Sequence, residues 1–188
     1  MSSTAVEIPG YLAGTWAIDP VHSEVSFTVR HMMVSKVRGR FDKFEGTIVT
    51  AENPLESTVA ATVDLTSIST GQEQRDAHIR SADFFEVETH PTMTFASSGV
   101  RAGGDQFLLD GDLTIKGVTK PVTFELEVSG FGPDSYGNTR AGFSAHTEIN
   151  RMDFGVSFNG PIPGVPGGVA VSEKVNIHLE IEGVLQAS

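Results

Sequence analysis

Apolar and polar side chains alternate along most of the chain, which is the pattern of strands with one buried face. Between Ser23 and Met33, for example, Val25, Phe27 and Val29 alternate with polar neighbours. The alternation changes phase at the sequence DKFEG, as it does at a β-bulge. The predicted strands are 23–33, 37–48 with the bulge inside it, 59–65, 92–101, 106–115, 122–130, 141–149 and 175–183.

About eight strands with hardly a helix between them predict an all-β, antiparallel barrel or sandwich. The inward series is rich in phenylalanine, and Gly39, Gly111, Gly130 and Gly183 fall in phase with it. Glycine inside a strand marks a bend or a close approach of the backbone, which a strongly curved, closed sheet needs. We therefore expect an eight-stranded barrel, whose interior is either filled by side chains or holds one small ligand.

The segment 72–85 breaks the alternation and is predicted to be a short helix. Thr70 and Glu73 have the spacing of a capping box, in which each side chain accepts a hydrogen bond from the other residue's backbone. At 3.6 residues per turn, Arg75, His78 and Phe85 share one stripe. The helix is thus polar at its start and aromatic at its end, where Phe84 precedes Phe85.

Two interpretations of this helix stay open. In the first, it plugs one end of the barrel and its two phenylalanines complete the core. In the second, the phenylalanines gate an opening while Arg75 and His78 stay at the rim. The residues alone favour the plug, because any open barrel end needs a cap.

A second break covers 150–173, where glycine and proline are so frequent that we expect a rim loop. At its start, Arg151 and Asp153 come just before Phe154. One interpretation is a turn fixed by an Arg–carboxylate pair, with Phe154 packed beneath it. The other is a site where Arg151 holds a polar head group through its several donors.

Composition narrows the function classes. The 188 residues suit a single domain, 1–188, and a net charge of -11 disfavours nucleic acid as a partner. No apolar run is long enough to span a membrane. The N-terminus has neither the charged nor the apolar region of a signal peptide, so a cytoplasmic location is expected. A periplasmic or secreted location is the alternative if a signal peptide has already been removed.

Catalytic signatures are missing from the sequence. It has no cysteine, no nucleotide-binding or hydrolase motif, and six scattered histidines without metal-ligand spacing. We therefore expect no enzyme, no catalytic residues, no cofactor and no metal. A metal site built on His31 and His78 is the weaker alternative, because a histidine on an apolar face is more often part of a core.

Four blocks of the chain stand out, in this order: WAIDPVHSEVSFTVRHMMVSKVRGRF, TGQEQRDAHIRSADFFEVETHPTMTF, GDLTIKGVTKPVTF and INRMDFGV. Together they resemble the YceI-like family of polyisoprenoid-binding proteins. The resemblance implies a lipocalin-like barrel with a core at about 14–185. It further implies that the protein forms a homodimer, as is common in the family, and that the interior holds the tail of an isoprenoid lipid or quinone, or a fatty amide as in some members. It favours a hollow barrel and a gating helix. A packed barrel that acts as an interaction domain without a ligand remains the alternative.

The resemblance and the alternation together imply which residues bind the ligand. The expected tunnel lining is Phe27, Val29, Phe95, Phe107, Leu109, Phe124, Leu126, Phe143, Ile177 and Leu179. The expected mouth and head-group residues are Arg75, His78, Phe84, Phe85, Arg151, Asp153 and Phe154.

Overall fold

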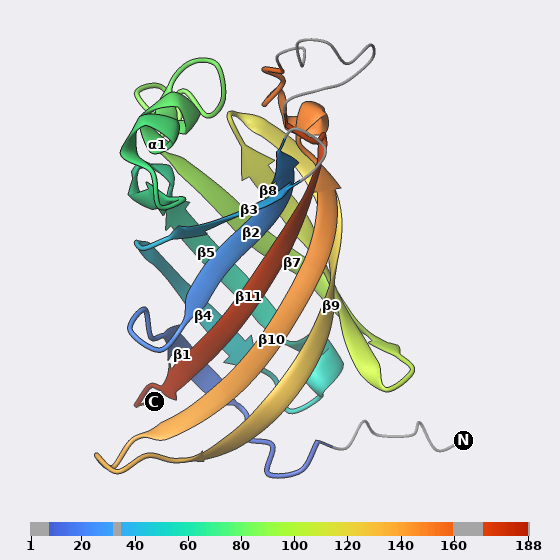
Figure 1. The fold of residues 1–188 in the computed structure, drawn as a ribbon. Coiled ribbons are helices and arrows are strands. Elements are labelled where there is room, and N and C mark those ends of the chain that lie inside the picture. Colours follow the sequence, from blue (N-terminus) through green and yellow to red (C-terminus); the bar gives the residue numbers. More distant parts are fainter. Residues whose placement is uncertain (1–7, 32–34, 160–170, 188) are drawn as a thin grey trace.

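The computed structural model describes residues 8–31, 35–159 and 171–187 (Figure 1). Its strands are β1 (Gly14–Ile18), β2 (Glu24–His31), β3 (Ser35–Phe41), β4 (Phe44–Thr50), β5 (Thr58–Asp64), β6 (Ile68–Ser69), β7 (Thr92–Gly103), β8 (Gln106–Ile115), β9 (Val118–Pro133), β10 (Thr139–Asn150) and β11 (Lys174–Leu185). The helix α1 spans Glu73–Arg80, and the 3-10 turns are η1 (Pro54–Glu56), η2 (Leu65–Ser67) and η3 (Arg151–Phe154).

The strands of the described chain close into an antiparallel barrel. Strand order runs β1-β4-β5-β7-β8-β9-β10-β11, and β1 pairs back onto β11. The first six strands form three bent strands, which are β1 with β2, β3 with β4, and β5 with β6. In the other half of the barrel β2, β3 and β6 again lie side by side, with β2 next to β11. Eight strand positions therefore surround the interior, and the prediction of a lipocalin-like, eight-stranded barrel is confirmed.

The phase change at DKFEG lies where β3 bends into β4. Asp42 and Lys43 leave the ladder, and Ser67 of η2 binds both of them. Its carbonyl accepts from the Asp42 N–H at 3.3 Å, and its Oγ accepts from the Lys43 N–H at 3.0 Å. Because two residues are skipped, Phe41 and Phe44 both face the interior.

The helix is shorter than predicted, and the capping box is wrong. Gln72 occupies the N-cap position and makes no capping bond through its side chain, while Glu73 accepts from Arg80 at 2.7 Å. The Thr70 hydroxyl instead bonds to the buried Asp76, which also accepts from the Thr70 N–H at 2.9 Å. The Asp76 carboxylate thus binds Thr70 in place of the expected Glu73. After Arg80 the chain folds into turns that carry Phe84 and Phe85.

Two strand glycines make room for phenylalanine rings inside the barrel. Gly39 lies opposite Phe27, and a Cβ built on Gly39 would lie 2.3 Å from that ring. A Cβ on Gly111 would lie 2.4 Å from the ring of Phe95. The expected close approach is therefore made by interior side chains that lie flat against the sheet.

Figure 1 shows α1 and η3 at one end of the barrel, here called the upper end, while β1 and the end of β11 lie toward the lower end. The helix contacts the short strand β6, which pairs with β3 at this end. The expected rim loop begins with η3 at the same end, and its residues 160–170 lie outside the described chain.

Candidate functional site: two stacked cavities in the barrel

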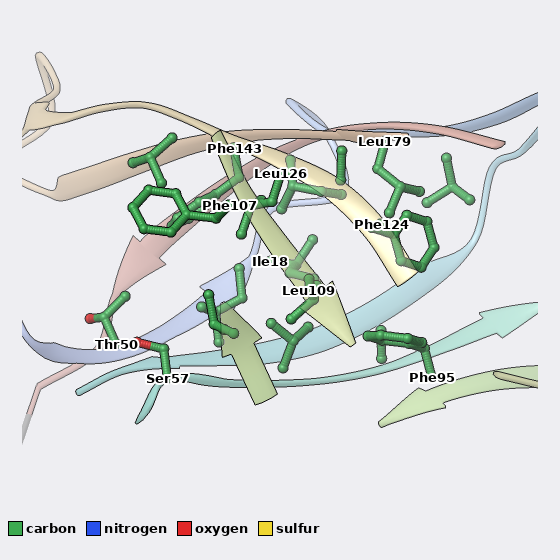
Figure 2. A pocket seen from close by; sticks show the side chains of 18 of the residues that line it. Ile18, Thr50, Ser57, Phe95, Phe107, Leu109, Phe124, Leu126, Phe143 and Leu179 are labelled. Atoms are coloured by element: carbon green, nitrogen blue, oxygen red, sulfur yellow. The ribbon is translucent and has the colours of Figure 1, made fainter. Parts of the chain in front are cut away.

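A cavity of 170 Å³ occupies the lower half of the barrel, and we call it the lower cavity. Figure 2 shows Phe107 and Phe143 toward the end that holds Thr50 and Ser57, and Phe95 and Phe124 toward the other end. Its walls contain the predicted tunnel residues Phe95, Phe107, Leu109, Phe124, Leu126, Phe143, Ile177 and Leu179.

Strand register places these side chains together. Leu109 lies opposite Phe124 between β8 and β9, and Phe107 lies opposite Leu126. The rings of Phe95 and Phe124 meet edge to face, with centroids 5.3 Å apart. Every second side chain of a strand lies on the same face of the sheet. Once one inward residue of each strand is known, the other wall residues of that strand therefore follow.

Two hydroxyl groups at the lower end, those of Tyr11 and Thr50, donate to backbone carbonyls. The Tyr11 hydroxyl donates to the carbonyl of Ala51. Thr50 donates to the carbonyl of Leu12 at 2.8 Å and accepts from the indole of Trp16 at 2.8 Å. The accessible wall of the lower cavity is accordingly almost entirely apolar.

A second cavity of 150 Å³, the upper cavity, lies between the upper barrel and the segments that cover it. Three of the predicted tunnel residues line it, namely Phe27, Val29 and Ile177. Five of the predicted mouth residues also line it, namely Arg75, Phe84, Phe85, Arg151 and Phe154. Every predicted tunnel residue therefore lines one cavity or the other, but His78 and Asp153 line neither.

The mouth phenylalanines are packed more deeply than a rim position requires. Phe84 is 8% exposed and Phe154 is 2% exposed, and both belong to a buried cluster with Leu113, Ile115 and Val156. Phe85 is half-buried and contacts this cluster and the neighbouring one around Phe41. This is the packing of the plug interpretation, while a gating movement stays a prediction.

Arg151 does not form the expected pair with Asp153. Its Nη1 donates to the carbonyls of Val156 at 2.7 Å and Phe158 at 2.8 Å. Its Nε donates to Ser172 at 2.9 Å and its Nη2 to Val171 at 3.2 Å. Arg151 is 5% exposed, and this burial lowers the pKa of its guanidinium. The side chain thus ties together both ends of the rim loop, and Asp153 is exposed.

The polar groups of Arg75 and His78 are also bound by other residues of the protein. Arg75 donates to the hydroxyl and the carbonyl of Thr70, both at 2.7 Å. His78 is exposed, binds Asp83 at 2.8 Å, and packs edge to face on Phe84 and Phe158. The accessible wall of the upper cavity is therefore apolar, although two arginines contribute their hydrocarbon stems to it.

Several lining residues were missed by the sequence analysis. Val25, Val63 and Ile181 share the parity of predicted neighbours, so the alternation already carried their signal. Met93 lies one residue into β7, where the pattern is just beginning. Tyr11 precedes β1, a strand of five residues that is too short to show alternation, and no sequence signal marks it.

The described residues contain one group with the spacing of metal ligands, Asp19, His22 and Glu182. Arg140 occupies this group, since its Nη1 donates to Asp19 at 2.7 Å and to Glu182 at 3.0 Å. Arg140 and His22 hold the pKa of Asp19 well below its usual range. The group is therefore explained as an ion-pair network, and the side chain of His31 lies outside the described residues.

In the described part of the chain, no helix is long and apolar enough to cross a membrane.

Comparison with known proteins agrees with this geometry. The model of the YceI-like domain matches residues 16–183. Protein YceI of Escherichia coli O157:H7 is 39% identical over 167 residues, which cover 88% of this chain and 83% of the relative.

Solved structures share the barrel. BcnA of Burkholderia cenocepacia superposes with a TM-score of 0.75 at 25% identity, covering 88% of this chain and 98% of that one. A polyisoprenoid binding domain from Saccharophagus degradans has the same fold, with a TM-score of 0.68 at 18% identity, covering 93% of this chain and all of its own. The domain model matches the chain from β1 to β11, and the Escherichia coli relative is 39% identical to it. The chain therefore belongs to the YceI-like family.

Proposed function

We propose that the protein binds the hydrocarbon tail of an isoprenoid lipid or prenyl quinone inside the barrel, and stores or transports it. The observation that carries this proposal is the pair of cavities with apolar walls, one above the other in the barrel. The family membership supports lipid binding in general.

The wall chemistry selects the ligand class. Each buried CH₂ group contributes about 0.8 kcal/mol, so a hydrocarbon chain gains affinity without any hydrogen bond. A polar group in the same place would lose its bonds to water and find no partner, at a cost of roughly 2 kcal/mol or more. The ligand's tail therefore belongs inside, and its head group belongs outside the apolar walls.

The isoprenoid class is supported by one structural relative, the Saccharophagus degradans domain, which is named for polyisoprenoid binding. The alternative of a fully packed interaction domain is disfavoured by the two cavities. The absence of catalysis, cofactor and metal, the homodimer and the cytoplasmic location stay predictions.

Organic extraction of the purified protein followed by mass spectrometry tests the proposal. We expect a prenyl lipid in the extract, and uptake of a prenyl quinone by delipidated protein. A ligand at a hundredfold excess over its Kd stabilises the folded state by about 2.7 kcal/mol, so the melting temperature should rise. The bare quinone ring without a tail is the matched control and should give no shift. Protein that is always empty and takes up no prenyl quinone would contradict the proposal.

A further inference from the structure

The two cavities share part of their walls, and we call this boundary the waist. Three side chains line both cavities, namely Val25 of β2, Met93 of β7 and Ile177 of β11. β2 and β11 are paired neighbours, so Val25 and Ile177 lie on one wall. β7 is four strand positions from β11 in either direction around the closed barrel, so Met93 faces them from the opposite wall.

The waist is a place of contact across the barrel. Met93 packs against the buried cluster that contains Val25, and also against the cluster around Phe84 and Leu113, which Ile177 contacts as well. A chain that passed from one cavity to the other would run between these side chains.

Met93 is the side chain best suited to move. Val25 and Ile177 are β-branched and lie within paired strands, so their first torsion angle is strongly restricted. Methionine is unbranched, has three rotatable bonds and adapts to irregular space. Met93 can therefore clear the waist by changing rotamer, without a movement of the barrel backbone.

The cavity volumes make this boundary matter for ligand length. Volumes of 170 and 150 Å³ are close to the apolar cavity of about 150 Å³ that holds a single benzene ring. One cavity alone therefore suits a short apolar group, whereas a chain of several isoprene units has to enter both.

We infer that Met93 determines ligand length, by separating the two cavities for short chains and swinging aside for prenyl chains long enough to occupy both. This inference rests on the proposed function. It deepens it by naming the residue that decides which prenyl chains cross the waist.

A chain-length series tests this role. Geraniol, farnesol, geranylgeraniol and solanesol are titrated into delipidated protein, and the affinity is measured for wild type and for Met93→Phe. Each buried CH₂ raises affinity about fourfold, so wild-type affinity should increase until both cavities are filled. The rigid ring of Met93→Phe should block the waist, reducing solanesol affinity at least about a hundredfold while changing geraniol affinity less than about threefold.

Met152→Phe is the matched control, because Met152 lies in η3 and lines neither cavity. It should leave the whole series unchanged. If Met93→Phe does not fold, Met93→Ala decides the question, since an open waist should speed solanesol association several-fold and leave geraniol association unchanged.

Equal effects of the Met93 variants on short and long prenols would overturn the inference. So would an unchanged length dependence in the folded Met93→Phe protein. Failure of every prenol to bind the wild type would instead contradict the proposed function, so the two failures are distinguishable.

Discussion

The lower and upper cavities have similar volumes, 170 and 150 Å³, but they are built in different ways. The lower cavity is enclosed mainly by long strands that are paired on both sides. The upper cavity is partly enclosed by α1, the turns after it, and η3 with the rim loop.

The difference shows what holds each end together. Around the lower cavity, backbone ladders satisfy the polar groups and leave side chains free to form the wall. At the upper end, single side chains do this work, with Arg151 binding four carbonyls and Asp76 binding Thr70. Segments held by few contacts open at lower free energy than core strands, so we expect ligand entry at the upper end.

Phe84→Ala should have the largest effect on stability. Phe84 is 8% exposed in a packed cluster, and removing a buried phenylalanine costs about 3 to 5 kcal/mol. Phe107→Ala is the matched change in the lower cavity, where one side of the ring already faces empty space, and should cost about half as much. Chemical denaturation measures both free energies of unfolding. Equal losses would show that the Phe84 ring is not packed more tightly than the Phe107 ring.

Phe84→Ala/Phe85→Ala addresses the plug and the gate together. If the pair gates the upper cavity, ligand release should accelerate about tenfold or more in a protein that still folds, since several contacts over the opening are lost. Stopped-flow displacement of a bound prenol measures this rate. Loss of stability with an unchanged release rate would leave the pair as a plug alone.

Arg151→Met should follow in size, at about 3 kcal/mol, because buried carbonyls lose charge-assisted hydrogen bonds. The effect should be local, with faster amide hydrogen exchange around Val156 and Ser172 and little change in the barrel strands. Arg101→Met is the control, since Arg101 only pairs with Asp110 on the exposed outer surface. Similar exchange in both variants would contradict the role assigned to Arg151.

Acid should lower the free energy of unfolding by a smaller amount, through the carboxylates that Arg140 binds and not through the carbonyls that Arg151 binds. Arg140 bridges Asp19 and Asp134 and holds the pKa of both carboxyls below their usual range. Groups with a lowered folded-state pKa contribute stability that is present above the usual carboxyl pKa of about 3.9 and is lost as the pH falls below it. The carbonyl acceptors of Arg151 do not titrate, so Arg151 should keep its hydrogen bonds to the rim loop.

The free energy of unfolding, measured from about pH 5 to about pH 2 where carboxyl groups take up protons, checks this expectation. Asp110, whose pKa Arg101 lowers to about 2, contributes in the same direction. Arg140→Gln should flatten the pH dependence, and an unchanged slope would exclude the Arg140 network as its source.

Ala145→Leu should change stability least, by less than about 1 kcal/mol, because the added methyl groups enter the lower cavity instead of a packed core. It should nevertheless weaken prenol binding about tenfold by occupying ligand volume. Ser144→Leu, one residue away and directed outward, is the control and should leave binding unchanged. A large loss of stability in Ala145→Leu would mean that the lower cavity is effectively filled.

The sequence predicts the lower cavity well, because its wall depends on local alternation. Phe107, Leu109 and Phe124 face inward for the same reason that their polar neighbours face outward. The strand count follows as well, although β1 escapes detection, because five residues give too few alternations.

The upper end was predicted less well, because its contacts are long-range. The sequence places Phe84 and Phe154 near an opening but gives no sign that both are buried in one cluster. Arg151 was expected to meet Asp153, two residues away, yet its acceptors include carbonyls about twenty residues on. Thr70 matches a capping box, and only the folded position of Asp76 shows why it does not form one.

A crystal structure of the protein loaded with a long prenyl quinone tests the central claim most directly. We predict continuous density for the tail from the upper cavity past Met93 into the lower cavity, with the quinone ring outside the apolar walls. Density confined to one cavity, or a ligand bound only on the outer surface of the barrel, would contradict the account.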